Sequence, residues 1–150
     1  MNSDPCGCYP ARFMLRRNKR GQRMDIQTIG IVGAGQMGNG IAHVMALAGY
    51  DVLLNDVSAE ALQKAVDTIT GNLDRQVGRG KVTEADRDAT LKRIVTTQTL
   101  EELGQSDLVI EAATERETVK QAIFEDLIPH LKPTTILTSN TSSISITRLA

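Results

Sequence analysis

A run of closely spaced glycines near the start of the chain constrains the fold more than any other feature. Gly33, Gly35 and Gly38 form the pattern G-x-G-x-x-G, which follows an apolar segment and opens a stretch rich in small residues. Gly33 permits a tight turn, Gly35 leaves room for a phosphate against backbone N–H groups, and Gly38 lets a helix lie close to the sheet. The short pattern alone is weak. In this setting it predicts a dinucleotide site, with a structural glycine turn as the alternative.

An aspartate at the end of the next apolar segment narrows the choice of cofactor. Asp56 lies 18 residues after Gly38 and closes the segment 51–56, which we predict to be a strand covered on both faces. A carboxylate there accepts hydrogen bonds from the adenosine ribose hydroxyls and repels a 2′-phosphate, so it favours NAD over NADP. Neither Asn55 nor Val57 supplies an arginine to neutralise a phosphate. The alternative interpretation is a helix-capping aspartate.

The rest of the chain alternates strands and helices. We expect strands at 26–32, 51–56, 94–98, 107–112 and 135–139. We expect helices at 36–48, 58–77, 83–93, from Thr99 to Gly104, from Thr114 or Glu115 to about His130, and from an N-cap at Ser145. Ser58 and the pairs Thr83–Asp86 and Thr99–Glu102 carry the other capping signals. This order predicts an α/β fold, a Rossmann-type doubly wound parallel sheet with a helical hairpin inserted after the second strand.

Charge and cysteine content exclude several classes. Six of the seventeen basic residues lie in the first 23 positions, so the remaining chain is acidic, which argues against binding of nucleic acid. No apolar run reaches the roughly 18 residues of a membrane span. Both cysteines, Cys6 and Cys8, lie in the leading segment, so we expect no disulfide framework, no metal site and a cytoplasmic location. We predict a disordered basic tail at 1–23 and an NAD-binding domain at 24–150.

Four motifs follow one another along the chain: G-A-G-Q-M-G-N-G-I-A, L-N-D-V-S, D-L-V-I-E-A-A-T-E and T-S-N-T-S-S-I. Their identity and order give the chain a resemblance to the 3-hydroxyacyl-CoA dehydrogenases, and among them to the bacterial members that act on 3-hydroxybutyryl-CoA. It implies oxidation of an (S)-3-hydroxyacyl-CoA to the 3-oxoacyl-CoA, with NAD as cofactor, an acyl-CoA as substrate and a homodimer as the complete enzyme. The alternatives are another β-hydroxyacid or sugar-nucleotide dehydrogenase, or a non-catalytic NAD-binding protein.

The resemblance also assigns roles to individual residues. Glu115 and Lys120 match a pair that contacts the nicotinamide half of NAD; without the family, both could be solvated residues of a first helical turn. Ser142 matches a serine that contacts the substrate hydroxyl, although the surrounding Asn-Thr-Ser-Ser also suits an ordinary turn. Arg79 or Lys81, at the tip of the helical hairpin, would meet CoA phosphates or simply form a solvated basic turn. The complete set of expected cofactor contacts is Gly33, Gly35, Gln36, Met37, Gly38, Asp56, Ala112, Glu115, Lys120 and Asn140.

One departure from the family limits the expected activity. The family's catalytic His and its assisting Glu follow the Ser-Asn-Thr-Ser motif at a distance that lies beyond Ala150. His43 and His130 both lie on predicted helices, and neither fits the role. General acid–base catalysis needs a group within hydrogen-bond reach of the hydroxyl proton. We therefore expect residues 1–150 to bind NAD without measurable turnover and to lack the family's helical C-terminal domain.

Overall fold

The computed structural model describes residues 25–149, so the tail predicted at 1–23 lies outside the described residues. The strands are β1 (Thr28–Val32), β2 (Asp51–Asn55), β3 (Ile94–Thr97), β4 (Leu108–Glu111) and β5 (Ile136–Ser139). The α-helices are α1 (Gln36–Leu47), α2 (Ala59–Gly78), α3 (Glu84–Lys92), α4 (Glu117–Leu127) and α5 (Ile146–Leu149). Two 3-10 helices, η1 (Glu101–Gln105) and η2 (Ile128–His130), complete the element order. The order of strands and helices confirms the prediction from sequence.

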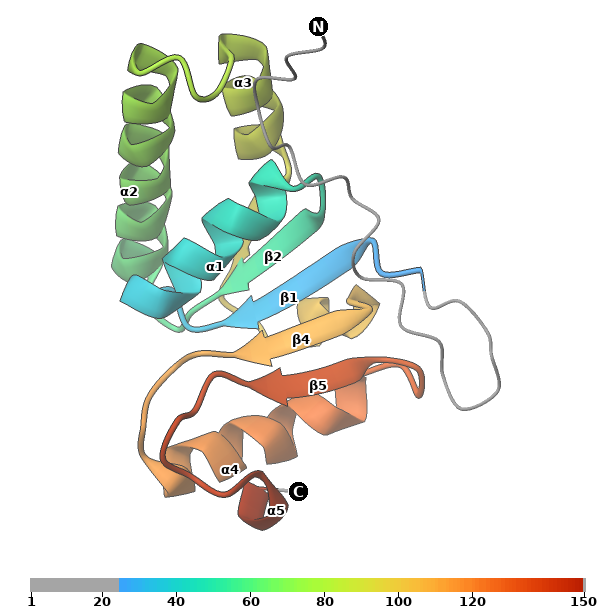
Figure 1. The fold of residues 1–150 in the computed structure, drawn as a ribbon. Helices are drawn as coiled ribbons and strands as arrows, with labels where there is room; N and C mark the ends of the chain where they lie inside the picture. The colour runs from blue at the N-terminus through green and yellow to red at the C-terminus, as the bar shows by residue number, and fades with distance from the viewer. Residues whose placement is uncertain (1–24, 150) are drawn as a thin grey trace, which may run out of the picture.

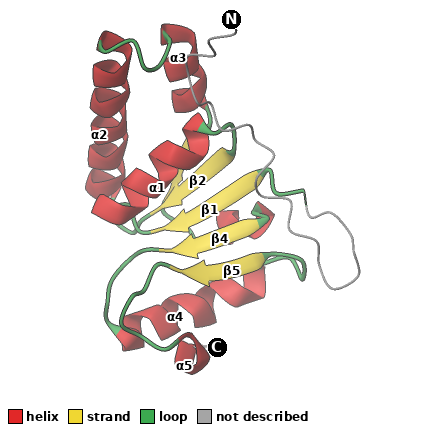
Figure 2. Ribbon diagram, in the orientation of Figure 1, coloured by secondary structure: helices red, strands yellow, loops and turns green. Residues whose placement is uncertain are grey.

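The five strands form one parallel sheet in the order β3-β2-β1-β4-β5. Helices α1, α2 and α3 lie on one side of the sheet, and α4 lies on the other (Figure 1; Figure 2). This arrangement confirms the doubly wound α/β fold and the helical hairpin α2–α3 after β2. The strand order reverses direction beside β1, and in sheets of this kind the ligand crevice lies outside the ends of the strands at that point, here β1 and β4. We call that side of the sheet the carboxyl edge.

Two apolar cores hold the layers together. The larger core joins β1 and β2 to α1 and α2, and α2 contributes a buried stripe at helical spacing: Leu62, Ala65, Ile69 and Leu73. The smaller core, on the opposite face, joins Val32 and Val109 of the sheet to Leu103 of η1 and Leu127 of α4. Burial on both faces explains why the central strands are almost continuously apolar.

The helix starts test the capping predictions. Ser58 is the N-cap of α2 and accepts a hydrogen bond from the Ala61 N–H at 3.1 Å, as predicted. Thr83 likewise caps α3 by accepting from the Asp86 N–H at 3.0 Å. The capping box predicted at Thr99 is wrong, because η1 begins at Glu101 and has no side-chain cap. The Thr99 N–H instead donates to Thr97 Oγ1 at 3.1 Å, which makes Thr99 part of the turn after β3.

Helix α4 is shorter than predicted at both ends. It begins at Glu117 rather than at Thr114 or Glu115, because Arg116 still has an extended backbone. It ends at Leu127, and the chain continues as the 3-10 helix η2 to His130. Pro129 lacks the N–H that another α-helical hydrogen bond would need, which accounts for the tighter last turn.

Candidate dinucleotide-binding site

The turn after β1 requires glycine at two positions. Gly33 has a φ of +103°, and a Cβ there would lie 2.7 Å from the carbonyl oxygen of Ala112 and 2.7 Å from the Cα of Ala113. A Cβ on Gly38 would lie 1.7 Å from the carbonyl oxygen of Gly33. Gly38 therefore brings α1 against the turn itself, as well as toward the sheet. The backbone after β4 lies directly against the same turn.

The N-terminus of α1 offers free hydrogen-bond donors. Gly35 is its N-cap, no side chain caps it, and its first turn holds no acidic residue. A Cβ on Gly35 would meet nothing within 4 Å, so the space beside this N-cap residue is open. Gln36 and Met37 flank the opening and are exposed. Uncapped N–H groups and the positive end of the helix dipole fit the pyrophosphate of a dinucleotide.

Asp56 joins the glycine turn to the start of α2. Its Oδ2 accepts from the Ala34 N–H and its Oδ1 accepts from the Ser58 N–H, both at 2.9 Å. Ser58, not Asp56, supplies the N-cap of α2, so the interpretation of Asp56 as the helix cap is wrong. Each carboxylate oxygen keeps acceptor capacity for a ribose hydroxyl. Val57 beside it is 87% exposed, an apolar surface next to the expected position of the adenosine.

The loops after β4 and β5 are joined by hydrogen bonds. Glu115 is exposed, and its Oε2 accepts from Ser143 Oγ at 2.9 Å and from Thr141 Oγ1 at 3.0 Å. These two hydroxyl donors lower the pKa of Glu115, and the Lys120 ammonium adds to the effect. The structure thus brings Glu115 next to the segment that contains Asn140 and Ser142, both of which are exposed.

Lys120 lies in the first turn of α4 but is almost fully buried, so the interpretation of it as a solvated helix residue is wrong. Its Nζ lies 2.6 Å from Oε2 of Glu111, and both side chains are at most 1% exposed. Lys120 therefore points inward toward the end of β4, while Glu115 lies at the surface.

Arg79 and Lys81 lie apart from the other predicted site residues. Arg79 is the C-cap of α2, at the tip of the α2–α3 hairpin (Figure 1). The 20 residues of α2 separate that tip from Asp56, a helix length of roughly 30 Å. Both basic side chains are exposed. Within the described residues, the structure does not bring them near the carboxyl edge.

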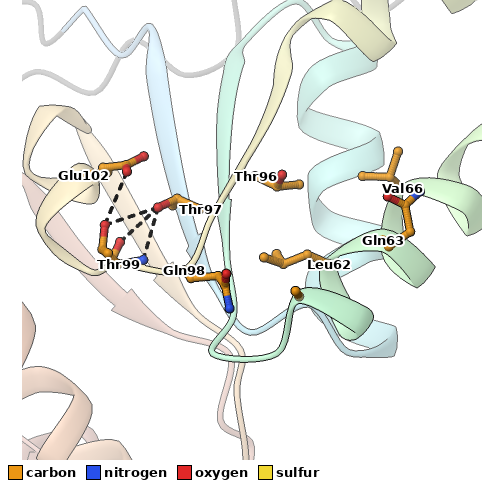
Figure 3. Close-up of a pocket in the computed structure, with 9 residues that line it drawn as sticks. Leu62, Gln63, Val66, Thr96, Thr97, Gln98, Thr99 and Glu102 are labelled. Atoms are coloured by element: carbon orange, nitrogen blue, oxygen red, sulfur yellow. Dashed lines mark hydrogen bonds between the residues drawn. The ribbon is translucent and has the colours of Figure 1, made fainter.

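A pocket of about 430 Å³ lies between the start of α2 and the end of β3 (Figure 3). Its lining residues are Ala59, Leu62, Gln63, Val66, Thr96, Thr97, Gln98, Thr99 and Glu102. The pocket adjoins the expected adenosine position, because the Asp56 N–H donates to the Thr97 carbonyl and Gln98 Nε2 donates to the Val57 carbonyl. None of the predicted cofactor residues lines it, so it is distinct from the cofactor position expected at the glycine turn.

Sequence reasoning missed several polar residues at the carboxyl edge, above all Glu111. It ends β4 and is completely buried, with Lys120 and Ser139 on the same carboxylate oxygen. A signal for it existed in the sequence, because an acid within the apolar run D-L-V-I-E needs a partner when the strand is buried. The hydroxyl groups of Thr141 and Ser143 were also missed.

The described residues form neither a metal centre nor a membrane-spanning helix. In that part of the chain, no three His, Cys, Asp or Glu side chains gather closely enough to hold a metal ion. None of its helices combines the length and the apolar character needed to cross a bilayer.

Comparison with known proteins identifies the family to which this site belongs. Residues 28–150 match the model of the 3-hydroxyacyl-CoA dehydrogenase NAD-binding domain. The chain is 58% identical over 125 residues to a 3-hydroxybutyryl-CoA dehydrogenase of Bradyrhizobium diazoefficiens, covering 83% of this chain and 43% of that protein. It is 49% identical over 127 residues to the 3-hydroxyadipyl-CoA dehydrogenase of Escherichia coli, covering 85% of this chain and 27% of that protein.

A solved structure shows the same arrangement. The (S)-3-hydroxybutyryl-CoA dehydrogenase of Ralstonia eutropha superposes with a TM-score of 0.81 at 46% identity, covering 83% of this chain and 44% of that one. This chain therefore spans less than half the length of these relatives.

Proposed function

Because the chain belongs to the 3-hydroxyacyl-CoA dehydrogenases through their NAD-binding domain, we propose that it supplies the cofactor-binding part of an enzyme that oxidises an (S)-3-hydroxyacyl-CoA. The observation that carries the proposal is the uncapped, acid-free start of α1, which follows directly on the Ala34 N–H that donates to Asp56. NAD accepts a hydride in such enzymes, and the protein contributes binding and orientation.

The site residues divide between the two halves of the cofactor. We propose that Asp56 binds the adenosine ribose and that Gly33, Gly35, Gln36, Met37 and Gly38 surround the pyrophosphate. Ala112, Glu115, Lys120 and Asn140 would hold the nicotinamide half, and Ser142 would contact the substrate hydroxyl. Their common position supports this division, since ligands of open α/β sheets bind where the strands end.

The substrate that we propose is 3-hydroxybutyryl-CoA. The name of the relative from Bradyrhizobium, at 58% identity, supports this choice. The relative named for 3-hydroxyadipyl-CoA, at 49% identity, makes a longer dicarboxylic acyl group the competing candidate. For CoA itself, we propose Arg79 or Lys81 as a phosphate contact, because both are exposed cations at the hairpin tip. A homodimer of the complete enzyme and a cytoplasmic location are further proposals.

Calorimetric titration of the 150-residue chain with NAD and with NADP tests the cofactor assignment. We expect the chain to bind NAD more tightly than NADP. The Asp56→Ala variant should have a lower affinity for NAD and a smaller difference between its affinities for NAD and NADP. A matched control is Asp51→Ala, because Asp51 is exposed at the opposite end of the same strand. Unchanged NAD affinity in Asp56→Ala would show that Asp56 does not bind the ribose.

The CoA contact is tested on the same chain by titrating CoA into the wild type and into Arg79→Ala and Lys81→Ala. Weaker binding in either variant, reduced further by salt, is the expected result for a phosphate contact at an exposed cation. Equal binding by all three proteins would leave the hairpin tip as a solvated basic turn.

A further inference from the structure

We propose that Glu111 is a positioning residue, which fixes the two loops that hold the nicotinamide half of the cofactor. It acts through its contacts with Ala113, Lys120 and Ser139, which together with Glu111 we call the Glu111 cluster. The inference rests on the NAD-binding function proposed above and adds a residue that does not itself reach the ligand. Glu111 is 0% exposed, so its influence must pass through these neighbours.

The Glu111 cluster joins three separate segments through one carboxylate. Oε2 accepts from Lys120 Nζ of α4 at 2.6 Å and from Ser139 Oγ at the end of β5, also at 2.6 Å. Oε1 accepts from the Ala113 N–H, in the loop after β4, at 2.8 Å. One side chain thus links the β4 loop, the end of β5 and the first turn of α4.

The cluster is continuous with the glycine turn. The backbone of Ala112 and Ala113 lies so close to Gly33 that a single added Cβ would come within 2.7 Å of it. Glu111 holds the same short segment through the Ala113 N–H. Its own carbonyl also accepts from the Asn140 N–H at 2.7 Å, which fixes the start of the β5 loop. A shift of the carboxylate would therefore move both loops relative to the turn.

Pairing of the strands does not by itself require this arrangement. The β4–β5 ladder already joins the two strands, and Thr138 Oγ1 adds a bond to the Val109 carbonyl at 3.0 Å. Buried ion pairs are also weak stabilisers, because desolvation offsets much of their attraction, and apolar replacements are often neutral. What an apolar pair cannot supply is three directed hydrogen bonds. The chemistry of the cluster therefore favours a role in geometry.

The position of the cluster determines which half of the cofactor it affects. Asp56 follows β2, on one side of β1, whereas the Glu111 cluster lies at β4 and β5, on the other side. A dinucleotide that spans the crevice places its adenosine toward β2 and its nicotinamide toward β4. A change in the cluster should therefore lower the affinity for NAD. The affinity for AMP should stay the same, because AMP lacks the nicotinamide ribose.

The test compares the dissociation constants of NAD and AMP for the 150-residue chain and its Glu111→Gln variant by calorimetry. Glutamine keeps the size of glutamate but loses the charge, and its NH2 group cannot accept, so at least one of the bonds from Ala113, Lys120 and Ser139 is lost. We expect the dissociation constant of NAD to rise about 10-fold, the usual scale of a charge-assisted hydrogen bond. That of AMP should stay within about 2-fold, as for a separate site.

Asp107→Ala is the matched control, because Asp107 precedes the same strand at its other end and also pairs with a lysine. It should lower stability but leave the ratio of NAD to AMP affinity unchanged. If Glu111→Gln does not fold, Ser139→Ala takes its place, and we expect this variant to raise the dissociation constant of NAD about 3-fold. An unchanged ratio in a folded variant overturns the inference about Glu111. Failure of the wild type to bind NAD overturns the proposed function instead.

Discussion

The two ends of β4 carry the same kind of ion pair in opposite surroundings. Before the strand, Asp107 lies 2.7 Å from Lys132, and the two side chains are 28% and 41% exposed. At its last residue, Glu111 lies 2.6 Å from Lys120, with 0% and 1% exposed. Water screens the exposed pair and is excluded from the buried pair. The two N–O distances are nearly equal, but breaking the two pairs should therefore change the free energy of unfolding by different amounts.

The two pairs also support different parts of the molecule. Asp107 Oδ2 accepts from the N–H groups of Gln27 and Thr28, both at 3.0 Å, and so fixes the start of β1 beside β4. Glu111 instead joins the loops that surround the glycine turn. The pair at the amino edge thus joins two strands of the sheet, whereas the pair at the carboxyl edge joins the loops beside the candidate site.

The largest expected effect is loss of the buried charge. Glu111→Gln leaves the Lys120 ammonium buried without a counter-charge, and we expect the free energy of unfolding to fall by about 3–5 kcal/mol. Urea denaturation measures this loss. The double variant Glu111→Gln/Lys120→Met should recover most of it, because no buried charge remains. A loss below about 1 kcal/mol in the single variant would mean that the pair behaves like an exposed one.

A smaller loss is expected at the amino end. Asp107→Ala removes the acceptor for two backbone N–H groups, and we expect a fall of about 1–3 kcal/mol in the free energy of unfolding. The same urea titration checks it. An equal loss in Asp107→Ala and Glu111→Gln would remove the distinction between the two ends of β4.

The contribution of Asp107 should depend on pH. Burial alone raises its pKa, but hydrogen bonds from Lys132 and from the N–H groups of Thr28 and Gln27 outweigh it, so the net pKa is lowered. A carboxyl whose pKa is lower in the folded state stabilises the protein above its unfolded pKa of about 3.9, and loses this effect as pH falls through the folded value. The difference in stability between wild type and Asp107→Ala should therefore shrink below about pH 4. If the difference in stability between the two proteins stayed constant from pH 7 to pH 2, the predicted pH dependence would be wrong.

The smallest effect is expected from Lys132→Met. Exposed ion pairs contribute about 0–1 kcal/mol, and salt screens them. Stability measured in low salt and in 1 M salt should show a small loss that disappears at high salt. Persistence of that loss in 1 M salt would indicate that the pair is shielded from solvent.

Much of the fold followed from local patterns. Strand and helix positions agreed with the prediction because burial on both faces makes parallel strands apolar and leaves α2 a periodic stripe. The caps at Ser58 and Thr83 were predictable because their partners lie three residues away. The errors at Thr99 and at the start of α4 arose where a distant or loop contact competed with helix formation. Thr99 is tied to Thr97, and Glu115 accepts hydroxyl donors from the β5 loop.

For the candidate site, the sequence by itself determined the glycine turn and the aspartate after β2, because both depend on spacing along one βαβ unit. The NAD-binding family is confirmed by comparison, while the individual contacts remain predictions. Only the tertiary structure decided the surroundings of Lys120. Its partner Glu111 ends β4, and Ser139, which donates to the same carboxylate oxygen, ends β5. Their convergence depends on the pairing of β4 with β5. A spacing of charges along the chain cannot show whether a lysine faces water or a buried carboxylate, because that is decided by packing between segments far apart in sequence.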